Sequence, residues 1–320
     1  MVERYRRIKR HRQYSHVLTE VLRQNKTRPI LVDIGASGDP PELWEPIASE
    51  SIYVGLDPDP REMHDTKENF FKTVIVERAL AEKKEDEDVL FYLTKSPFCS
   101  STLPPLTDEL ERYGFHDLFT VVGKTVAPAI SFTDLLGNPD IPRIDWLKLD
   151  TQGCDLRLYK SIPSKARSEL LVVDVEPGLM KAYEGEDFFS DVDAFMRGEG
   201  FWLSDLSVRG TQRISRQSLE RFCKKESKTD CLEKIRISPG WVGARYLRGL
   251  EWLRSQGTPI DRYILLWVFA MLEKQYGYCL DISYTIQDAF PETSWGQRIF
   301  ETTNRFINGD KKSANEYNPL

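Results

Sequence analysis

The segment LVDIGASGDPPELWEPIASESIYVGLDPDP, from Leu31 to Pro60, holds two short apolar runs separated by a small loop and a helix-like stretch. Gly35 and Gly38 lie in the loop after the first run, and Asp57 follows the second run. A strand, a glycine loop, a helix and a second strand in this order predict a crossover unit of a parallel sheet. Because ligands bind at the carboxyl ends of such strands, the loop and Asp57 are candidate ligand contacts.

Short apolar runs of the same kind recur along the chain and alternate with helix-like segments. They are Ile30–Ile34, Ile52–Leu56, Thr73–Val76, Ile144–Leu149 and Leu170–Val175. This alternation predicts an α/β fold with a doubly wound, mainly parallel sheet. Four acids lie at or just past the ends of these runs: Asp33, Asp57, Asp150 and Glu176.

The character of the chain changes near residue 207, where a charged, cysteine-bearing stretch follows the apolar runs. We therefore expect an N-terminal helical segment over 1–28, a ligand-binding domain over 29–206 and a helical C-terminal region over 207–320. In the last region, 239–257 and 259–277 read as helices. Most of the apolar residues of the first of these share one helical face: Trp241, Ala244, Tyr246, Leu247, Leu250 and Leu253.

Composition narrows the function classes. The 320 residues carry a formal net charge of −6, which argues against a dedicated nucleic-acid binder. The basic stretch Arg4–Arg12 reads as a solvated helix face, with an anionic partner as the alternative. The apolar run Tyr263–Leu272 is shorter than the roughly 20 residues that cross a bilayer.

Cysteine usage and the N-terminus indicate the compartment. The chain has an odd number of cysteines and no C-x-x-C pair, which predicts free thiols: Cys99, Cys154, Cys223, Cys231 and Cys279. The N-terminus shows no apolar secretory region. We therefore expect a cytoplasmic protein.

The opening loop differs from a dinucleotide-binding loop, which needs three glycines to approach a pyrophosphate. Asp39 and Glu42 lie where a helix would begin, and they would repel a phosphate dianion. S-adenosylmethionine carries an ammonium and a sulfonium but no phosphate, so it suits this loop better. Asp57, 24 positions after Asp33, is placed to accept hydrogen bonds from ribose hydroxyls. The alternative is structural: Asp33 caps a helix and Asp57 starts a turn.

Three further blocks extend this pattern. They are ERALAEKKEDEDVLFYLTKSPFCSSTLPP (77–105), IPRIDWLKLDTQGCDLRLYKSI (141–162) and LLVVDVEPGLMKAYEGEDFFSDVDAFMRGEGFWLSDL (170–206). Together with the opening loop, they resemble the FkbM-type family of S-adenosylmethionine-dependent methyltransferases over roughly Leu31 to Leu206. The most recognisable part is a strand that ends in K-x-D and is followed by an acid or amide, a glycine and an acid.

The resemblance implies a Rossmann-like class I methyltransferase fold and methylation of a hydroxyl on a sugar, a glycan or a related polar metabolite. It implies that the methionine part of the cofactor is contacted by Asp33, Gly35, Ala36, Ser37 and Gly38. It implies that Asp57 and Pro58 contact the ribose, and that Ala79 and Leu80 border the adenine. The chain departs from the family at Gln152, where an acid is common. An amide is not a base, so the role of that acid does not carry over.

Transfer of a methyl group to an alcohol needs a group that takes the hydroxyl proton or a metal ion that acidifies it. Strand alternation places Lys148 and Asp150 on one side of one strand, and Asp174 and Glu176 on one side of another. If these strands are neighbours, Asp150 and Glu176 converge. We predict Asp150 as the base or substrate orienter and Glu176 as the second choice. Lys148 would hold a carboxylate or polarise the acceptor oxygen.

Other interpretations stay open from the sequence. The same acids also fit a buried ion pair with a helix cap, and a bound Mg²⁺ is less favoured because neither D-x-D spacing nor a histidine supports it. On a Rossmann-like fold, a nucleotide-dependent oxidoreductase or epimerase is the alternative enzyme. A non-catalytic interaction protein, acting through its C-terminal helices, is the alternative from another class. The expected partner is a small-molecule or glycan acceptor, and the sequence does not indicate an oligomeric state.

Overall fold

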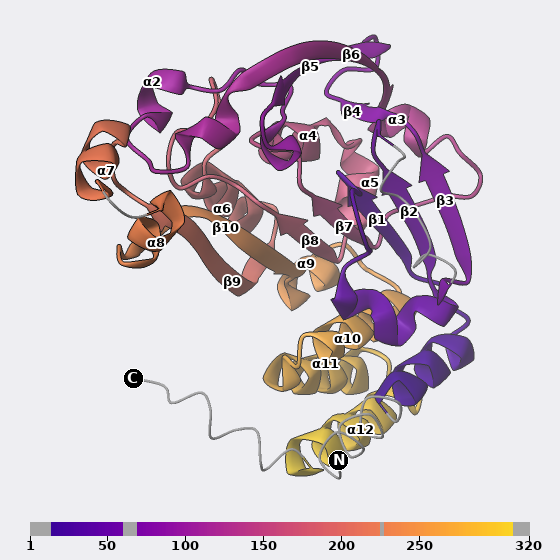
Figure 1. The fold of residues 1–320 in the computed structure, drawn as a ribbon. Coiled ribbons are helices and arrows are strands. Elements are labelled where there is room, and N and C mark those ends of the chain that lie inside the picture. The colour runs from indigo at the N-terminus through magenta and orange to yellow at the C-terminus, as the bar shows by residue number, and fades with distance from the viewer. Residues whose placement is uncertain (1–13, 60–68, 225–226, 310–320) are drawn as a thin grey trace.

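The computed structural model describes residues 14–59, 69–224 and 227–309, which form an α/β fold around a central sheet (Figure 1). Within these residues the central sheet has seven strands in the order β3-β2-β1-β7-β8-β10-β9, and a smaller sheet has the order β4-β6-β5. The strands are β1 (Ile30–Ile34), β2 (Ile52–Leu56), β3 (Lys72–Val76), β4 (Ala79–Ala81), β5 (Asp88–Thr94), β6 (Val121–Ser131), β7 (Trp146–Leu149), β8 (Val172–Val175), β9 (Phe201–Gln212) and β10 (Ile237–Arg248).

Helical segments connect these strands and follow them. They are η1 (Glu42–Glu50), η4 (Pro97–Cys99), α2 (Thr107–Leu110), η5 (His116–Phe119), α3 (Phe132–Leu135), α4 (Asp155–Ser161), α5 (Ser164–Glu169), α6 (Phe189–Gly198), α7 (Arg216–Phe222), α8 (Lys228–Glu233), α9 (Leu250–Ser255), α10 (Ile260–Leu272), α11 (Tyr276–Ala289) and α12 (Trp295–Gly309). Residues 14–24 form a further helix.

The five predicted apolar runs become β1, β2, β3, β7 and β8, so the mainly parallel sheet is confirmed. β1 pairs in parallel with both β2 and β7, and β7 pairs in parallel with β8. β1 is buried at every position, because apolar layers cover both faces of the sheet. The strands that carry Asp150 and Glu176 are therefore direct neighbours.

The helix predicted over 239–257 is wrong for most of its length. This part of the chain forms β10, which pairs antiparallel with β8 on one side and with β9 on the other. Val242, Ala244 and Tyr246 are buried at every second position, which is the period of a strand. Trp241, Ala244 and Leu247 in the same stretch fit a helical face, and only the pairing with β8 and β9 decides between the two periods.

The expected domain boundary also needs correction. Residue 207 lies inside β9, and β9 and β10 complete the central sheet, so the sheet-bearing part of the chain continues to Arg248. The purely helical part begins with α9. Of the expected N-terminal segment 1–28, the helix over 14–24 is described, whereas the basic stretch Arg4–Arg12 lies outside the described residues.

The C-terminal helices cover one face of the central sheet. α10 is buried from Arg262 to Leu272, and the Phe269 ring meets the Trp146 ring of β7 at 5.0 Å between centroids. Leu18 and Leu22 of the N-terminal helix belong to the same apolar cluster. In Figure 1 this helix lies with α10, α11 and α12 on one side of the molecule, and β5 and β6 lie on the opposite side.

A buried charge cluster joins α10 to the starts of β1 and β7. Asp145 is fully buried and forms ion pairs with Arg262 of α10 and with Arg143, the latter at 2.8 Å. Its other carboxylate oxygen accepts a hydrogen bond from the Ile30 backbone N–H at 2.8 Å. Burial alone would raise the pKa of Asp145, but the two guanidinium groups outweigh burial and hold the pKa below its ordinary value.

The prediction of free thiols is wrong for one pair of cysteines. Cys223 and Cys231 are joined in a disulfide, because the consecutive short helices α7 and α8 bring their Cα atoms to 5.8 Å. Cys99, Cys154 and Cys279 are free. Among the described residues, no helix combines the length and the apolar character needed to span a membrane.

Asp145→Ala is expected to lower the free energy of unfolding by roughly 3–5 kcal/mol, because Arg262 would keep a buried charge without its carboxylate. Urea denaturation followed by circular dichroism measures this. Asp140→Ala is the matched control, since Asp140 and Lys72 form an exposed ion pair, and it should cost less than about 1 kcal/mol. Similar losses for the two variants would contradict the proposed anchoring of α10.

Candidate functional site

A large cavity lies at the carboxyl ends of the parallel strands, between the central sheet and the smaller sheet. Its volume is approximately 1860 Å³. The ends of β1, β2, β7 and β8 contribute Gly35, Asp57, Asp150 and Glu176 to its lining, as expected for ligand binding in such sheets. Ser37, Pro58, Ala79 and Leu80 line the same cavity. Eight of the predicted site residues are thus brought together around one space.

Gly35 sets the shape of the cavity floor. Its φ of +78° is a conformation that favours glycine, and a Cβ at this position would lie 2.3 Å from the backbone oxygen of Asp150. The backbone N–H groups of Gly35 and Ala36 both donate to the Leu56 oxygen, at 2.9 and 3.0 Å. The loop therefore holds the ends of β1, β2 and β7 in contact, and only a glycine fits there.

Asp33 and Lys148 do not line the cavity, although both were predicted site residues. Asp33 is 2% exposed, and the Lys148 ammonium lies 2.8 Å from its carboxylate. The Tyr53 hydroxyl donates to the other oxygen of Asp33 at 3.2 Å. Burial alone would lower the pKa of Lys148, but the carboxylates of Asp33 and Asp150 raise it. The two side chains form an ion pair beneath the loop. Of the two roles predicted for Lys148, the structure therefore shows the first, which is to hold a carboxylate.

Ala36 and Gly38 also lie outside the cavity lining. Ala36 is buried, and it packs in the turn after β1. Gly38 has a φ of +86° with open space where a Cβ would be, so it gives the loop its direction. Neither residue lines the cavity, and their contacts with the methionine part of a cofactor stay a prediction.

Asp150 is oriented by Gln152, which the sequence excluded as a base. The Gln152 amide donates to the Asp150 carboxylate at 2.8 Å, and Gln152 adopts a positive φ of 54°. The Tyr183 hydroxyl lies 3.3 Å from the Gln152 side-chain oxygen and 2.9 Å from the Cys99 carbonyl, to which it donates. The Ser101 hydroxyl donates to the Gln152 carbonyl at 2.7 Å. These partners come from distant segments, so no local signal predicted this network.

Glu176 faces Asp150 at the end of the neighbouring strand. Burial, followed by the negative charge of Asp150, raises the pKa of Glu176 to about 7. Its backbone N–H donates to the buried Asp155 carboxylate at 2.7 Å, and the Thr151 hydroxyl donates to the other Asp155 oxygen at 2.6 Å. Burial also raises the pKa of Asp155 to about 6. Asp155 thereby joins the two strand ends that carry Asp150 and Glu176.

The far wall of the cavity carries the predicted nucleoside contacts. One Asp57 carboxylate oxygen accepts the Asp59 backbone N–H at 2.8 Å, which fixes the turn after β2. Ala79 and Leu80 belong to β4 and are buried, so they offer an apolar surface next to this acid. Asp57 therefore starts a turn, as the structural alternative predicted, and its side chain also lines the cavity.

Charge along the cavity is strongly one-sided. Among the described lining residues, seven side chains carry a carboxyl group, two carry a guanidinium group and none is a lysine. The acids are Asp57, Asp59, Glu82, Asp86, Asp150, Glu176 and Glu186, and the two guanidinium groups belong to Arg78 and Arg157. Arg157 forms an ion pair with Asp187 at 3.0 Å, and Arg78 donates to the Ala129 carbonyl at 3.3 Å. Within the described part of the chain, no group of three or more His, Cys, Asp or Glu side chains is arranged to hold a metal ion.

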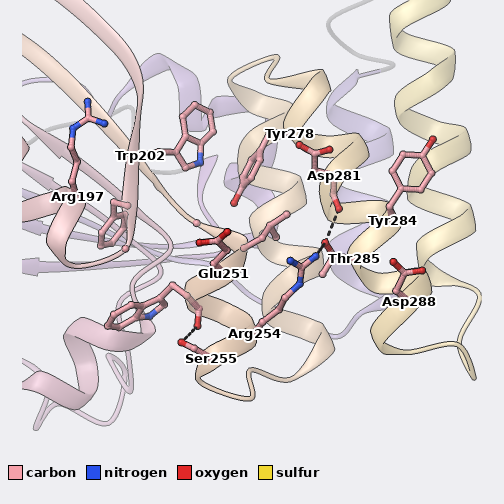
Figure 2. Close-up of a pocket in the computed structure, with 15 residues that line it drawn as sticks. Arg197, Trp202, Glu251, Arg254, Ser255, Tyr278, Asp281, Tyr284, Thr285 and Asp288 are labelled. Carbon is pink, nitrogen blue, oxygen red and sulfur yellow. Dashed lines mark hydrogen bonds between the residues drawn. The ribbon is translucent and has the colours of Figure 1, made fainter.

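A second, shallower cavity of approximately 870 Å³ lies at the opposite edge of the sheet (Figure 2). It is formed where β9 begins, after β10 ends, and along one face each of α9 and α11. Trp202, Tyr278, Arg254 and Asp281 are among its lining residues, and Arg254 donates to Thr285 at 2.8 Å. None of the predicted site residues lies there, and the carboxyl ends of the parallel strands do not point to it.

Comparisons with known proteins add no assignment: the chain matches no protein-family model and no curated protein. The resemblance to the FkbM-type family therefore stays a prediction.

Glu176→Gln is expected to stabilise the protein by about 1–3 kcal/mol at pH 8 and much less at pH 5. Folding raises the pKa of Glu176 from 4.5 to about 7, so the folded protein loses stability as the pH rises between these values. Glutamine does not ionise, and its gain appears only where Glu176 would be charged. Urea denaturation at the two pH values measures the gain.

The exposed Glu82 lines the same cavity and supplies the control. Glu82→Gln should change the free energy of unfolding by less than about 0.5 kcal/mol at either pH. A Glu176→Gln gain that is equal at pH 5 and pH 8 would show that burial and Asp150 do not raise the pKa of Glu176.

Proposed function

We propose that this protein is an S-adenosylmethionine-dependent methyltransferase that transfers the methyl group to a hydroxyl of its acceptor. The observation that carries the proposal is the acid-lined cavity at the strand carboxyl ends, where Gly35, Asp57 and Asp150 lie around one space. Its volume of approximately 1860 Å³ exceeds the roughly 300–1,000 Å³ of a typical small-ligand pocket. The cavity has room for a methyl donor and an acceptor together.

The lining suits a cationic donor better than a phosphate-bearing cofactor. Carboxylates attract the ammonium and the sulfonium of S-adenosylmethionine, whereas they repel a pyrophosphate. The two arginines in the lining already have protein partners. Asp57 would accept hydrogen bonds from the ribose hydroxyls, Ala79 and Leu80 would border the adenine, and the loop from Gly35 to Ser37 would approach the methionine part.

Asp150 and Glu176 divide the proton chemistry between them. Burial and neighbouring negative charge raise the pKa of Glu176 to about 7, so Glu176 holds a proton for much of the time at neutral pH. The Gln152 amide donates to the Asp150 side chain and fixes its direction. We assign Asp150 as the group that takes the proton from the acceptor hydroxyl.

The reaction balances with these groups. When bound, S-adenosylmethionine supplies a methyl group on a positively charged sulfur that leaves as a neutral thioether. The acceptor oxygen forms the new bond to the methyl carbon as its proton passes to Asp150, and the carbon–sulfur bond breaks. Much of the rate acceleration would come from alignment of oxygen, carbon and sulfur by the rigid strand ends.

The alternative of a nucleotide-dependent oxidoreductase or epimerase is less well supported. Dinucleotide-binding sheets of this type place a sixth parallel strand beside the fifth, in the order 3-2-1-4-5-6. Here the antiparallel β10 lies between β8 and β9. The loop after β1 also has two glycines instead of three. No specific observation favours a non-catalytic role.

Calorimetric titration with S-adenosylhomocysteine, S-adenosylmethionine and NAD tests the proposal. We expect both sulfur nucleosides to bind and NAD not to bind, because the acidic lining repels a pyrophosphate. Binding of NAD without binding of either sulfur nucleoside would overturn the proposal and favour the oxidoreductase.

Asp57→Ala is expected to weaken S-adenosylhomocysteine binding by about 1–3 kcal/mol, which corresponds to roughly 5- to 150-fold in Kd. The reason is the loss of hydrogen bonds between ribose hydroxyls and a charged acceptor. Asp39→Ala is the control, because Asp39 lies in the same region but does not line the cavity. The same calorimetric titration measures both variants, and equal Kd values for Asp57→Ala and the unmodified protein would remove Asp57 from the site.

A further inference from the structure

The outer wall of the cavity carries apolar side chains that are unusually exposed. Phe98 of η4 is 72% exposed, and Leu93 of β5 is 37% exposed. Leu118 of η5 and Trp241 of β10 are 43% and 39% exposed, and all four line the cavity. Single exposed apolar residues are ordinary, but a group of them around one cavity marks a binding surface.

The β5 side chain among these faces the cavity and not merely the solvent. On β5, Val89, Phe91 and Leu93 line the cavity, whereas Leu90, at an intervening position, does not. Successive residues of a strand point to opposite faces, so this alternation assigns one face of β5 to the cavity. In Figure 1, β5 and β6 lie on the side of the molecule opposite to α10, so the helical layer does not cover this wall.

The apolar wall is continuous with the acidic floor through one side chain. The Tyr183 hydroxyl contacts the Gln152 amide, which in turn holds Asp150. The Tyr183 ring lies 5.6 Å from the Phe119 ring, which lines the cavity next to Leu118. A ligand with its hydroxyl at Asp150 would therefore have its remaining atoms against the apolar wall.

We propose that the acceptor is an amphiphile: a small molecule that carries its hydroxyl on an apolar body. This inference rests on the proposed function, and it narrows the acceptor class predicted from the sequence, which was a polar sugar-like molecule. The hydroxyl lies at Asp150 and Glu176, and an alkyl or similarly apolar part covers Phe98, Leu118 and their neighbours. A sugar satisfies this only if it bears an apolar substituent.

The test is calorimetric titration of the protein saturated with S-adenosylhomocysteine by methyl, hexyl and octyl β-glucosides, each kept below its micelle concentration. Each buried methylene should tighten binding roughly fourfold, so the octyl compound should bind at least tenfold more tightly than the methyl compound. Equal affinities across the series would overturn the inference.

A pair of double variants separates the cavity wall from apolar surface in general. Phe98→Ser with Leu118→Ser should remove most of the dependence on chain length, because both residues line the cavity and are exposed. Leu90→Ser with Val208→Ser should leave it unchanged, because these two residues are 42% and 56% exposed but do not line the cavity. S-adenosylhomocysteine should bind both double variants as it binds the unmodified protein, which shows that they fold. Equal losses in both double variants would contradict the assignment of the wall.

Two further outcomes would change these assignments. If S-adenosylhomocysteine does not bind, the proposed function fails, and the glucoside series on the protein alone still tests the apolar wall. Co-sedimentation with phosphatidylcholine vesicles supplies the last arm. Vesicle binding that depends on Phe98 and Leu118, without chain-length dependence for the dispersed glucosides, would make the wall a membrane contact and overturn the acceptor assignment.

Discussion

The close approach of the Gly35 backbone to Asp150 is the constraint on which the site depends. With no Cβ, Gly35 turns the chain after β1 directly against the end of β7, while its N–H bonds to the end of β2. Three strand ends are held at contact distance by this one residue. Any larger side chain would separate the wall that carries Asp57 from the floor that carries Asp150, and a single ligand would no longer reach both.

The second feature of the site is a concentration of negative charge that the fold tolerates at a cost. Asp33 is compensated by Lys148, and Asp145 by two arginines. Asp150 and Glu176 face the cavity instead, and burial near Asp150 raises the pKa of Glu176. Asp33 and Asp145 are therefore held in ion pairs, whereas Asp150 and Glu176 meet the space that a ligand would fill. A positively charged or proton-donating ligand would relieve the repulsion between these two acids, and it would also neutralise part of the acidic lining.

Particular elements show how far sequence reasoning extends. The parallel strands were predictable because each is a short apolar run between turn residues, which is typical of strands buried on both faces of a sheet. The convergence of Asp150 and Glu176 was predictable because both follow neighbouring strands. β10 was not predictable, since its apolar residues satisfy a helical and an extended period alike. The disulfide between Cys223 and Cys231 depends on how two short helices meet, which no spacing rule gives.

The sequence by itself determined the class of fold and the edge of the sheet where a ligand is expected to bind, because local periodicity and the position of acids after strands are written along the chain. Tertiary structure decided the role of each side chain there. It placed Asp33 beneath the floor with Lys148, and it placed Gln152 between Asp150 and Tyr183. It also set an apolar wall from β5, η4 and η5 against the acids. The physical reason is that these contacts join segments far apart in the chain, so their distances are set by packing and not by any local pattern.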